Sequence, residues 1–157
     1  MTPHPWSAGD PLEEIDRAIL RELADNGRVS FTDMSERVGL SVSAVHQRVR
    51  RLERRGVVRG YSARINHDEL GLPLTALISL TPFDPAAPDD YPARLEHLPE
   101  IEACYSVAGD ESYVLLARVE SPAALEDLLR RIRESANVST RTTVVLSTPF
   151  EGRPPRI

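Results

Sequence analysis

The first third of the chain has apolar residues at helical spacing, and three short helices account for the pattern. Over residues 11–26 the spacing predicts a helix that ends at the Asn-Gly pair 26–27, in the left-handed conformation that glycine adopts readily. A second helix is predicted over 32–37, with Gly39 after it as a C-terminal cap. Ser41 would cap a third helix by accepting from free N–H groups of its first turn. The apolar residues expected to form the core are Ile15, Ile19, Leu23, Val29, Phe31, Met34, Val38, Leu40, Val45, Val49 and Leu52.

Beyond residue 56 the spacing of apolar residues shortens toward that of strands. Residues 57–65 suit a strand pair or an extended linker, and the turn-forming residues after them predict a boundary near 66–72. The remainder predicts, in order, strand 74–81, helix 91–97, strand 101–107, strand 112–119, helix 122–135 and strand 138–147. That βαββαβ order is typical of a ferredoxin-like sandwich. We therefore expect an α+β protein with an N-terminal winged helix-turn-helix and a C-terminal ferredoxin-like βαββαβ domain.

These elements divide the chain into four parts. Residues 1–11 hold three prolines and no periodic pattern, which predicts a disordered arm. The helix-turn-helix domain is expected over 12–66 and the βαββαβ domain over 72–150. The proline-rich residues 151–157 are expected to be a flexible tail.

The predicted sheet has helices on one side only, so its other face needs a cover. A second copy of the chain is the expected cover, which predicts self-association. The residues expected on that face are Leu77, Ile78, Val114, Leu116, Val144 and Leu146.

Charge is distributed unevenly along the chain. The formal net charge is -5, but residues 1–66 hold 11 arginines and 9 acidic residues, a net charge of +2, whereas the remainder has a net charge of -7. Within 28–64 there are 9 arginines and 3 acidic residues, a net charge of +6. A locally basic segment on an acidic protein fits contact with the phosphates of double-stranded DNA.

The third predicted helix is a candidate recognition helix for a DNA major groove. A solvated charged surface is the alternative for its arginines, and the helix-turn-helix pattern favours DNA. The residues expected at base edges are Ser43, Ala44, Gln47 and Arg48, while Ser41, Arg50, Arg51, Arg54 and Arg59 are expected near the duplex, mainly at phosphates. His46 is either a contact to a base or phosphate or an incidental surface residue.

Other functions have little support in the sequence. No apolar run is long enough to cross a bilayer and the N-terminus lacks the pattern of a signal peptide, so we expect a cytoplasmic protein without a membrane partner. The single cysteine, Cys104, is expected to be a buried small residue. Asp110, Glu111 and Ser112 could suggest acid-base or nucleophile chemistry, but a turn is the simpler interpretation because no histidine lies at a matching spacing. No metal-ligand spacing or phosphate-binding glycine loop occurs, so no cofactor is expected.

Several motifs resemble the Lrp/AsnC family of feast/famine transcription regulators over about residues 12–150. The family pattern LDxxDxxILxxL stands here as LEEIDRAILREL, with Glu13 in place of the family's first Asp. The family's helix-turn-helix pattern stands as NGRVSFTDMSERVGLSVSAVHQRVRRLERRGVV, with Met34 where Leu is usual. The second domain, RAM-type in that family, is similar in LPEIEACYSVAGDESYVLLARV and NVSTRTTVVLS.

The resemblance implies a DNA-binding regulator that forms homodimers and often octamers and binds amino acids or related small metabolites between subunits. The effector site that it implies is Val107, Ala108, Gly109, Asp110, Glu111, Ser112 and Tyr113, with Thr140 and Thr142 on the last strand. Ser112 departs from the family, which commonly has Asp there, and a hydroxyl binds a ligand's ammonium group less strongly than a carboxylate. The alternative is an enzyme on the same two-domain frame, similar to haem-pathway decarboxylases, which would need His and Arg gathered in the C-terminal cleft.

Overall fold

The computed structural model describes residues 12–84, 86 and 88–157, and the chain divides into two compact units. The first unit runs to Arg64 and also includes Phe150–Ile157, and the second is Ile65–Pro149. The predicted arm, residues 1–11, lies outside the described residues.

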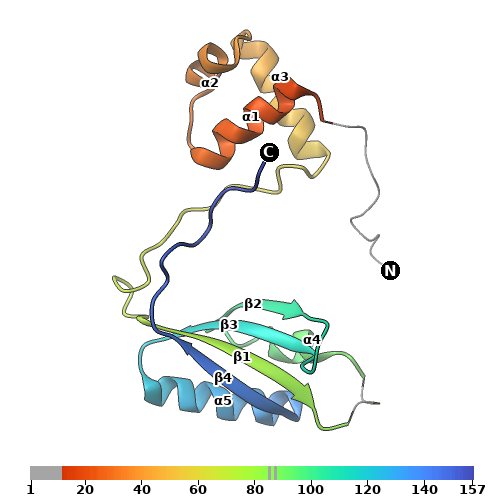
Figure 1. Ribbon diagram of the computed structural model, residues 1–157, viewed down its shortest axis with the longest axis vertical. Coiled ribbons are helices and arrows are strands. Elements are labelled where there is room, and N and C mark those ends of the chain that lie inside the picture. The colour runs from red at the N-terminus through yellow and green to blue at the C-terminus, as the bar shows by residue number, and fades with distance from the viewer. Residues whose placement is uncertain (1–11, 85, 87) are drawn as a thin grey trace. The chain divides into compact units, whose positions relative to one another are not determined.

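The first unit contains three helices, α1 (Glu14–Asp25), α2 (Phe31–Val38) and α3 (Val42–Arg54) (Figure 1). Residues outside the helices set their limits. The Ser30 side chain accepts from the N–H of Asp33 and begins α2, and Gly39 ends it with a φ of 69°. Ser41 then accepts from the N–H of Ala44 and begins α3. The short turn between α2 and α3 that the sequence predicts is thereby confirmed.

The predicted ends of α1 are wrong. The helix begins at Glu14, three residues later than predicted, and ends at Asp25, after which Asn26 is extended rather than left-handed, with a φ of -141°. The Asn26 side chain instead accepts from the N–H of Arg28, 3.0 Å away. This hydrogen bond from the backbone to the Asn26 side chain stabilises the turn after α1, where a left-handed cap was predicted.

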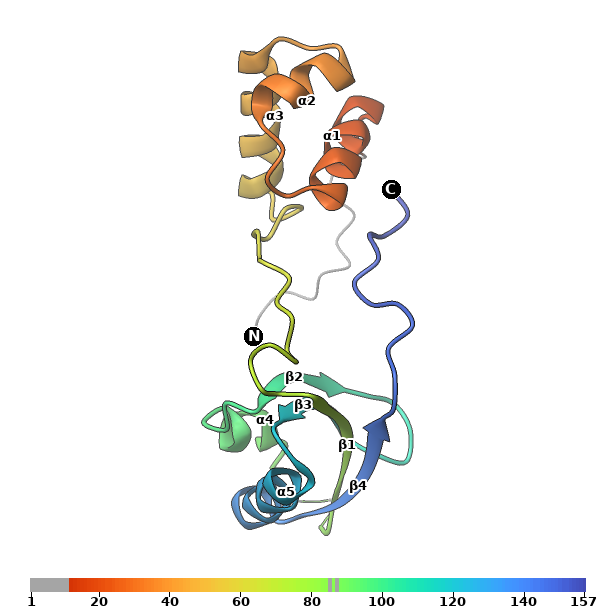
Figure 2. The same ribbon diagram turned by 90° about the vertical axis from the view of Figure 1, so that its left-hand side faces the viewer.

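The three helices of the first unit, which Figure 2 shows from the side, enclose a small apolar core. Its fully enclosed members are Ile19, Leu20, Met34, Val45, Val49 and Leu52. Residues outside the predicted core also join it: Leu20 is enclosed, the Asp16 side chain is buried beside the core, and Leu12, Val58 and Ile157 pack on its edge. Arg21 Nε donates to the Ile157 backbone oxygen at 3.1 Å, so the predicted flexible tail contacts α1. Residues 57–65 form no strand: residues 57–58 are a bend, and residues 59–65 have no regular secondary structure.

The second unit has the predicted βαββαβ order. Its elements are β1 (Leu74–Pro82), α4 (Tyr91–Leu95), β2 (Ile101–Ser106), β3 (Tyr113–Val119), α5 (Pro122–Ala136) and β4 (Val138–Val145). The strands form one sheet in the order β2-β3-β1-β4, and all neighbouring strands are antiparallel. Ser121 accepts from the N–H of Ala124 and begins α5, as predicted.

Both helices of this unit cover the same face of the sheet (Figure 2). Alternate residues of β1 and β3 face them, and Ile78, Leu80 and Leu115 are almost completely buried there. Cys104 lies on the edge strand β2 and is exposed, so its predicted burial is wrong.

The opposite face of the sheet carries exposed or half-buried apolar side chains. We call it the open sheet face and define it by Leu77, Tyr105, Val114, Leu116 and Val145. The sequence also placed Ile78, Val144 and Leu146 there. Ile78 is completely buried under the helices, Val144 pairs with the buried Ala76 and shares its side, and Leu146 follows the end of β4. Successive strand residues point to opposite faces, so Leu77 and Ile78 cannot share one.

The described residues include no helix that is both long and apolar enough to cross a membrane.

Candidate DNA interface and ligand pocket

The outer surface of α3 is basic and hollowed. The residues that line the hollow are Ala44, His46, Gln47, Arg48, Arg50, Arg51 and Arg54. They lie there because Val45, Val49 and Leu52 occupy the opposite side of the helix and anchor it in the core. Seven of the ten residues predicted to contact DNA are therefore gathered on one surface.

Several predicted contacts are exposed, and the arginines among them have no competing partner in the described part of the chain. Ser43, Gln47, Arg50, Arg54 and Arg59 are exposed. In the described part of the chain, the three arginines among them form no ion pair and no side-chain hydrogen bond. Their guanidinium groups are therefore available to acceptors outside the unit.

Ser41 and His46 have contacts within the unit. The Ser41 oxygen caps α3 and lies 3.1 Å from the Ser43 oxygen. His46 is half-buried, and its ring packs against Phe31 of α2 with 5.2 Å between ring centroids. His46 therefore helps to join α2 to α3.

Arg48 and Arg51 are turned toward two carboxylates of the α1 region. Arg48 Nη1 lies 2.9 Å from Asp16 Oδ1 and 3.0 Å from Glu13 Oε2. Arg51 Nη2 lies 2.6 Å from Asp16 Oδ2 and 3.2 Å from Glu13 Oε1. The sequence predicted that Arg48 reads a base and gave Asp16 and Glu13 no part in the site. In the structure the four side chains form one cluster that joins α1 to α3, which we call the Glu13–Arg51 cluster.

Hydrogen bonding within this cluster favours the charged forms. Donation from Arg48 and then Arg51 holds the pKa of the Glu13 carboxyl below its ordinary value. Hydrogen bonds to Asp16 are the largest cause of the raised pKa of both arginines. Two sequence signals pointed to Asp16: its match to the second Asp of the family pattern, and its place between the apolar positions Ile15 and Ile19 of α1.

A pocket of about 570 Å³ lies in the second unit beside the β2–β3 loop. Every residue of the predicted loop 107–113 lines it. The others are Thr81 and Pro82 at the end of β1, Asp84, Asp89, Tyr91 and Ser106. The two aspartates come from the β1–α4 connection and were not predicted, because nothing in the sequence indicates how that loop folds back.

Thr140 and Thr142 do not line the pocket. They pair with Leu80 and Ile78, which are buried under the helices, so their side chains share that side of the sheet. The Thr140 hydroxyl accordingly lies 3.4 Å from Arg133 Nη1 of α5. The register of β4 thus directs both side chains away from the predicted site.

Hydrogen bonds hold the polar groups of the pocket. The Tyr113 hydroxyl donates to Asp89 Oδ1 at 2.8 Å, and this bond is the largest cause of the raised pKa of Tyr113. Glu111 is paired with Arg141. The Ser112 N–H donates to the Leu80 backbone oxygen at 2.9 Å, which fixes the loop against β1.

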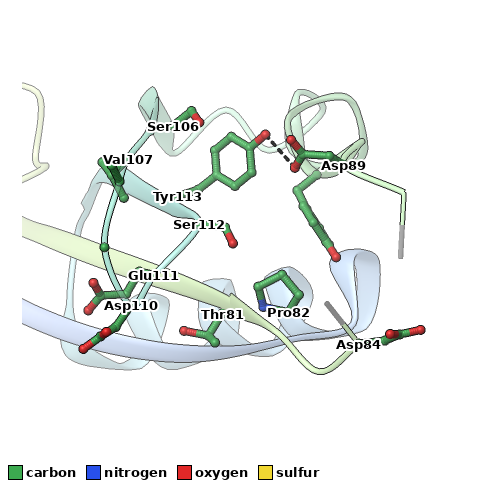
Figure 3. A pocket seen from close by; sticks show the side chains of 13 residues that line it. Thr81, Pro82, Asp84, Asp89, Ser106, Val107, Asp110, Glu111, Ser112 and Tyr113 are labelled. Atoms are coloured by element: carbon green, nitrogen blue, oxygen red, sulfur yellow. Dashed lines mark hydrogen bonds between the residues drawn. The ribbon is translucent and has the colours of Figure 1, made fainter. Parts of the chain in front are cut away.

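Carboxylates lie on two sides of this pocket. Figure 3 shows Asp110 and Glu111 on one side and Asp89 on the other, with the Ser112 hydroxyl between them. Acidic groups on opposite sides of one hollow favour a ligand with a cationic group. In the part of the chain that the structure describes, no three His, Cys, Asp or Glu side chains are placed to share a metal ion.

Both units match known protein families. Residues 12–59 match the model of a winged helix-turn-helix DNA-binding domain, and residues 75–155 match the Lrp/AsnC ligand binding domain. The HTH-type transcriptional regulator LrpA of Mycobacterium tuberculosis is 60% identical over 144 residues, which cover 92% of this chain and 96% of the relative. The leucine-responsive regulatory protein of Salmonella typhimurium is 40% identical over 143 residues, covering 88% of this chain and 87% of the relative.

A solved structure is similar over the same extent. The feast or famine regulatory protein from M. tuberculosis, complexed with L-methionine, aligns with a TM-score of 0.90 at 59% identity. The alignment covers 92% of this chain and 99% of that one.

Proposed function

The chain belongs to the Lrp/AsnC family of transcriptional regulators, and from that membership we propose which residues bind DNA and which bind an effector. The family establishes a DNA-binding regulator and not an enzyme, so the decarboxylase alternative is set aside. The family's ligand-binding domain also implies self-association and an amino-acid effector.

The first unit reads DNA through the exposed residues of α3. Ser43, Ala44 and Gln47 near its N-terminus contact base edges in the major groove, where a Gln can make paired bonds to adenine. Arg50, Arg54 and Arg59 contact phosphates, because their guanidinium groups have no partner within the described residues. Ser41 and His46 lie beside the duplex while they hold α3 in place. The main support for this proposal is the basic surface of α3, whose Arg50 and Arg54 are unpaired in the described residues. Gly39 ends α2 and Ser41 begins α3, so this helix is held at a defined position after the turn.

Two such units in a dimer would bind half-sites separated by whole turns of the duplex. We propose that the operator is a palindromic site near the protein's own gene. The open sheet face is the surface that the second copy covers, because the helices of this unit leave it bare and it carries exposed or half-buried apolar side chains. An octamer would be four of these dimers.

The second unit binds an amino acid in the pocket beside the β2–β3 loop. Asp89 and Asp110 would receive the ammonium group that Ser112 receives poorly, and Tyr113 orients Asp89. The related M. tuberculosis protein was solved with L-methionine, which makes this amino acid the first ligand to test. Effector binding would change DNA affinity only to the extent that it favours one state of the protein.

The DNA assignment is tested by fluorescence anisotropy of the full chain on two labelled duplexes, one from upstream of its own gene and one scrambled. Arg50→Ala and Arg54→Ala should each weaken binding to both duplexes and reduce the slope of log affinity against log salt by about 1. Gln47→Ala should reduce the preference for the upstream duplex and leave the slope unchanged. Arg130→Ala, an exposed arginine of α5 paired with Asp127, is the control. If the Arg50 and Arg54 variants bind as the control does, the assignment is wrong.

A further inference from the structure

The Glu13–Arg51 cluster has an inner and an outer carboxylate. The Asp16 side chain is 1% exposed, whereas the Glu13 side chain is 54% exposed. Both carboxylates nevertheless accept from the same two guanidinium groups, at 2.6–3.2 Å. Asp16 is therefore fixed in the protein, and Glu13 is the member of the cluster that solvent reaches.

The cluster neutralises two of the arginines that belong to the basic surface of α3. Arg48 and Arg51 line the same hollow as Gln47, Arg50 and Arg54. Two carboxylates balance their two positive charges, so in the free protein they add nothing to the attraction for phosphate. Removing the charge of Glu13 alone would return one positive charge to the surface.

Within the described residues, the Glu13 side chain forms ion pairs with Arg48 and Arg51 and no others. Glu13 precedes α1 in an extended conformation and its side chain makes no capping hydrogen bond to the helix. Its two carboxylate oxygens accept hydrogen bonds from Arg48 and Arg51. In the family pattern a shorter Asp stands at this position, and Glu can extend one carbon further toward α3.

Arg48 and Arg51 remain partly accessible to solvent, because their side chains are 26% and 39% exposed. The Nε of Arg51 is buried, so a phosphate would reach the outer nitrogens that Glu13 contacts, Arg48 Nη1 and Arg51 Nη2. A phosphate offers several oxygens to a guanidinium and takes the same paired geometry as a carboxylate.

We propose that Glu13 occupies a phosphate-binding position on Arg48 and Arg51, and that a phosphate of the DNA backbone displaces it when the protein binds. Asp16 stays in place and keeps both arginines oriented. Glu13 thus weakens binding to any duplex, because it competes with a group that carries no sequence information. This proposal rests on α3 being the DNA-binding helix.

The competing explanation is that Glu13 only braces α1 against α3. Removal of the Glu13 carboxylate would change DNA affinity in opposite directions in these two cases. Loss of a brace would loosen α3 and weaken DNA binding, with a lower thermal unfolding temperature. Loss of a competitor strengthens binding and adds one phosphate contact.

The test compares Glu13→Gln with Glu14→Gln in the full chain. Glu14 is the neighbouring residue, is 76% exposed and pairs with Arg21, so the control makes the same change in net charge beside the same helix. Affinities are measured by fluorescence anisotropy over a range of salt concentrations. The two duplexes are a labelled one from upstream of the protein's own gene and a scrambled one of equal length.

We expect Glu13→Gln to bind both duplexes about three- to tenfold more tightly than the Glu14→Gln control, with a salt slope steeper by about 1. The thermal unfolding temperature should match that of the control. Equal affinities and slopes for the two variants would overturn the proposal. Weaker binding by Glu13→Gln would overturn it as well, and would show that Glu13 instead stabilises the packing of α1 against α3. If the unmodified protein shows no salt-dependent binding to either duplex, the DNA assignment of α3 itself fails.

Discussion

Asp16 of α1 and Arg48 of α3 are 32 residues apart in the sequence and form an ion pair of 2.9 Å around a carboxylate that is 1% exposed. Asp16 makes a second such contact with Arg51, so one buried acid joins two helices of the first unit. A buried charge is tolerated when it is paired and hydrogen-bonded, and its loss leaves the partners uncompensated.

Asp16→Ala should therefore destabilise the helical unit strongly. Removal of Asp16 leaves Arg48 and Arg51 paired only with Glu13 and partly exposed, so the expected cost is about 1–3 kcal/mol, the value for the loss of a buried hydrogen-bond partner. We expect urea denaturation, followed by far-ultraviolet circular dichroism, to show an earlier loss of helix. Asp25→Ala, at the exposed end of the same helix, is the matched control. Unfolding of both variants at the same urea concentration would contradict the structural importance of Asp16.

The pocket provides a second prediction, because Tyr113 donates to Asp89 at 2.8 Å. Tyr113→Phe removes the hydrogen bond and keeps the ring, so Asp89 loses its orientation. We expect affinity for L-methionine, measured by isothermal titration calorimetry, to fall about two- to tenfold, which is the net value of one hydrogen bond. Tyr61→Phe removes a hydroxyl of the first unit that likewise donates to a carboxylate, that of Glu53 at 3.0 Å, and should bind as the unmodified protein does. Unchanged affinity in the Tyr113 variant would remove Asp89 from the proposed site.

The stability of the second unit should depend on pH through Glu100. Hydrogen bonding to Arg131 is the largest cause of the pKa of Glu100 lying below its ordinary value of 4.5. The folded protein therefore binds this proton more weakly than the unfolded chain does. The stabilisation is complete above pH 4.5 and is lost as the pH falls through the lowered pKa of the folded state.

Glu100→Gln should accordingly reduce the acid dependence of unfolding. Thermal unfolding temperatures of the full chain, measured from pH 6 down through the ordinary carboxyl pKa of 4.5, should fall less steeply in this variant. Glu126→Gln is the control, since Glu126 is an exposed residue of α5 without an ion pair in the described structure. A Glu100 variant with the same acid profile as the control would show that the Arg131 contact contributes no measurable stability.

Local rules predict much of this fold from the sequence. Gly39, Ser41 and Ser121 each act on backbone groups within a few residues, so their positions alone identify the turn between α2 and α3 and the start of α5. The alternation of apolar residues likewise predicts the order of strands and helices in the second unit. The exposed positions of α3 follow from the same rule, because the buried side of a helix determines the opposite one.

Long-range contacts account for what the sequence does not reveal. Asp16 matches the family pattern, but the pattern does not reveal its partners, because the two arginines that α3 brings to it lie 32 and 35 residues away. Asp89 reaches the pocket only because the β1–α4 connection folds back. Thr140 lies outside the pocket because the face of a strand residue depends on register, and a shift of one residue reverses it. The family resemblance supplies the location of the pocket, but the side chains that complete it come from the structure.

Strand register also determines which side chains lie on the open sheet face. Leu77 pairs with Leu116 across β1 and β3, and both side chains point away from the helices. A charged residue at the centre of this face would have to be buried without a partner in the proposed dimer, which is strongly unfavourable. We expect Leu116→Arg to reduce the mass measured by light scattering after size-exclusion chromatography to that of one chain. Leu146→Arg is the control, because Leu146 is 96% exposed and lies beyond β4. If the Leu116 variant keeps the mass of the unmodified protein, the second copy covers another surface, and the DNA-binding units are paired through contacts outside the open sheet face.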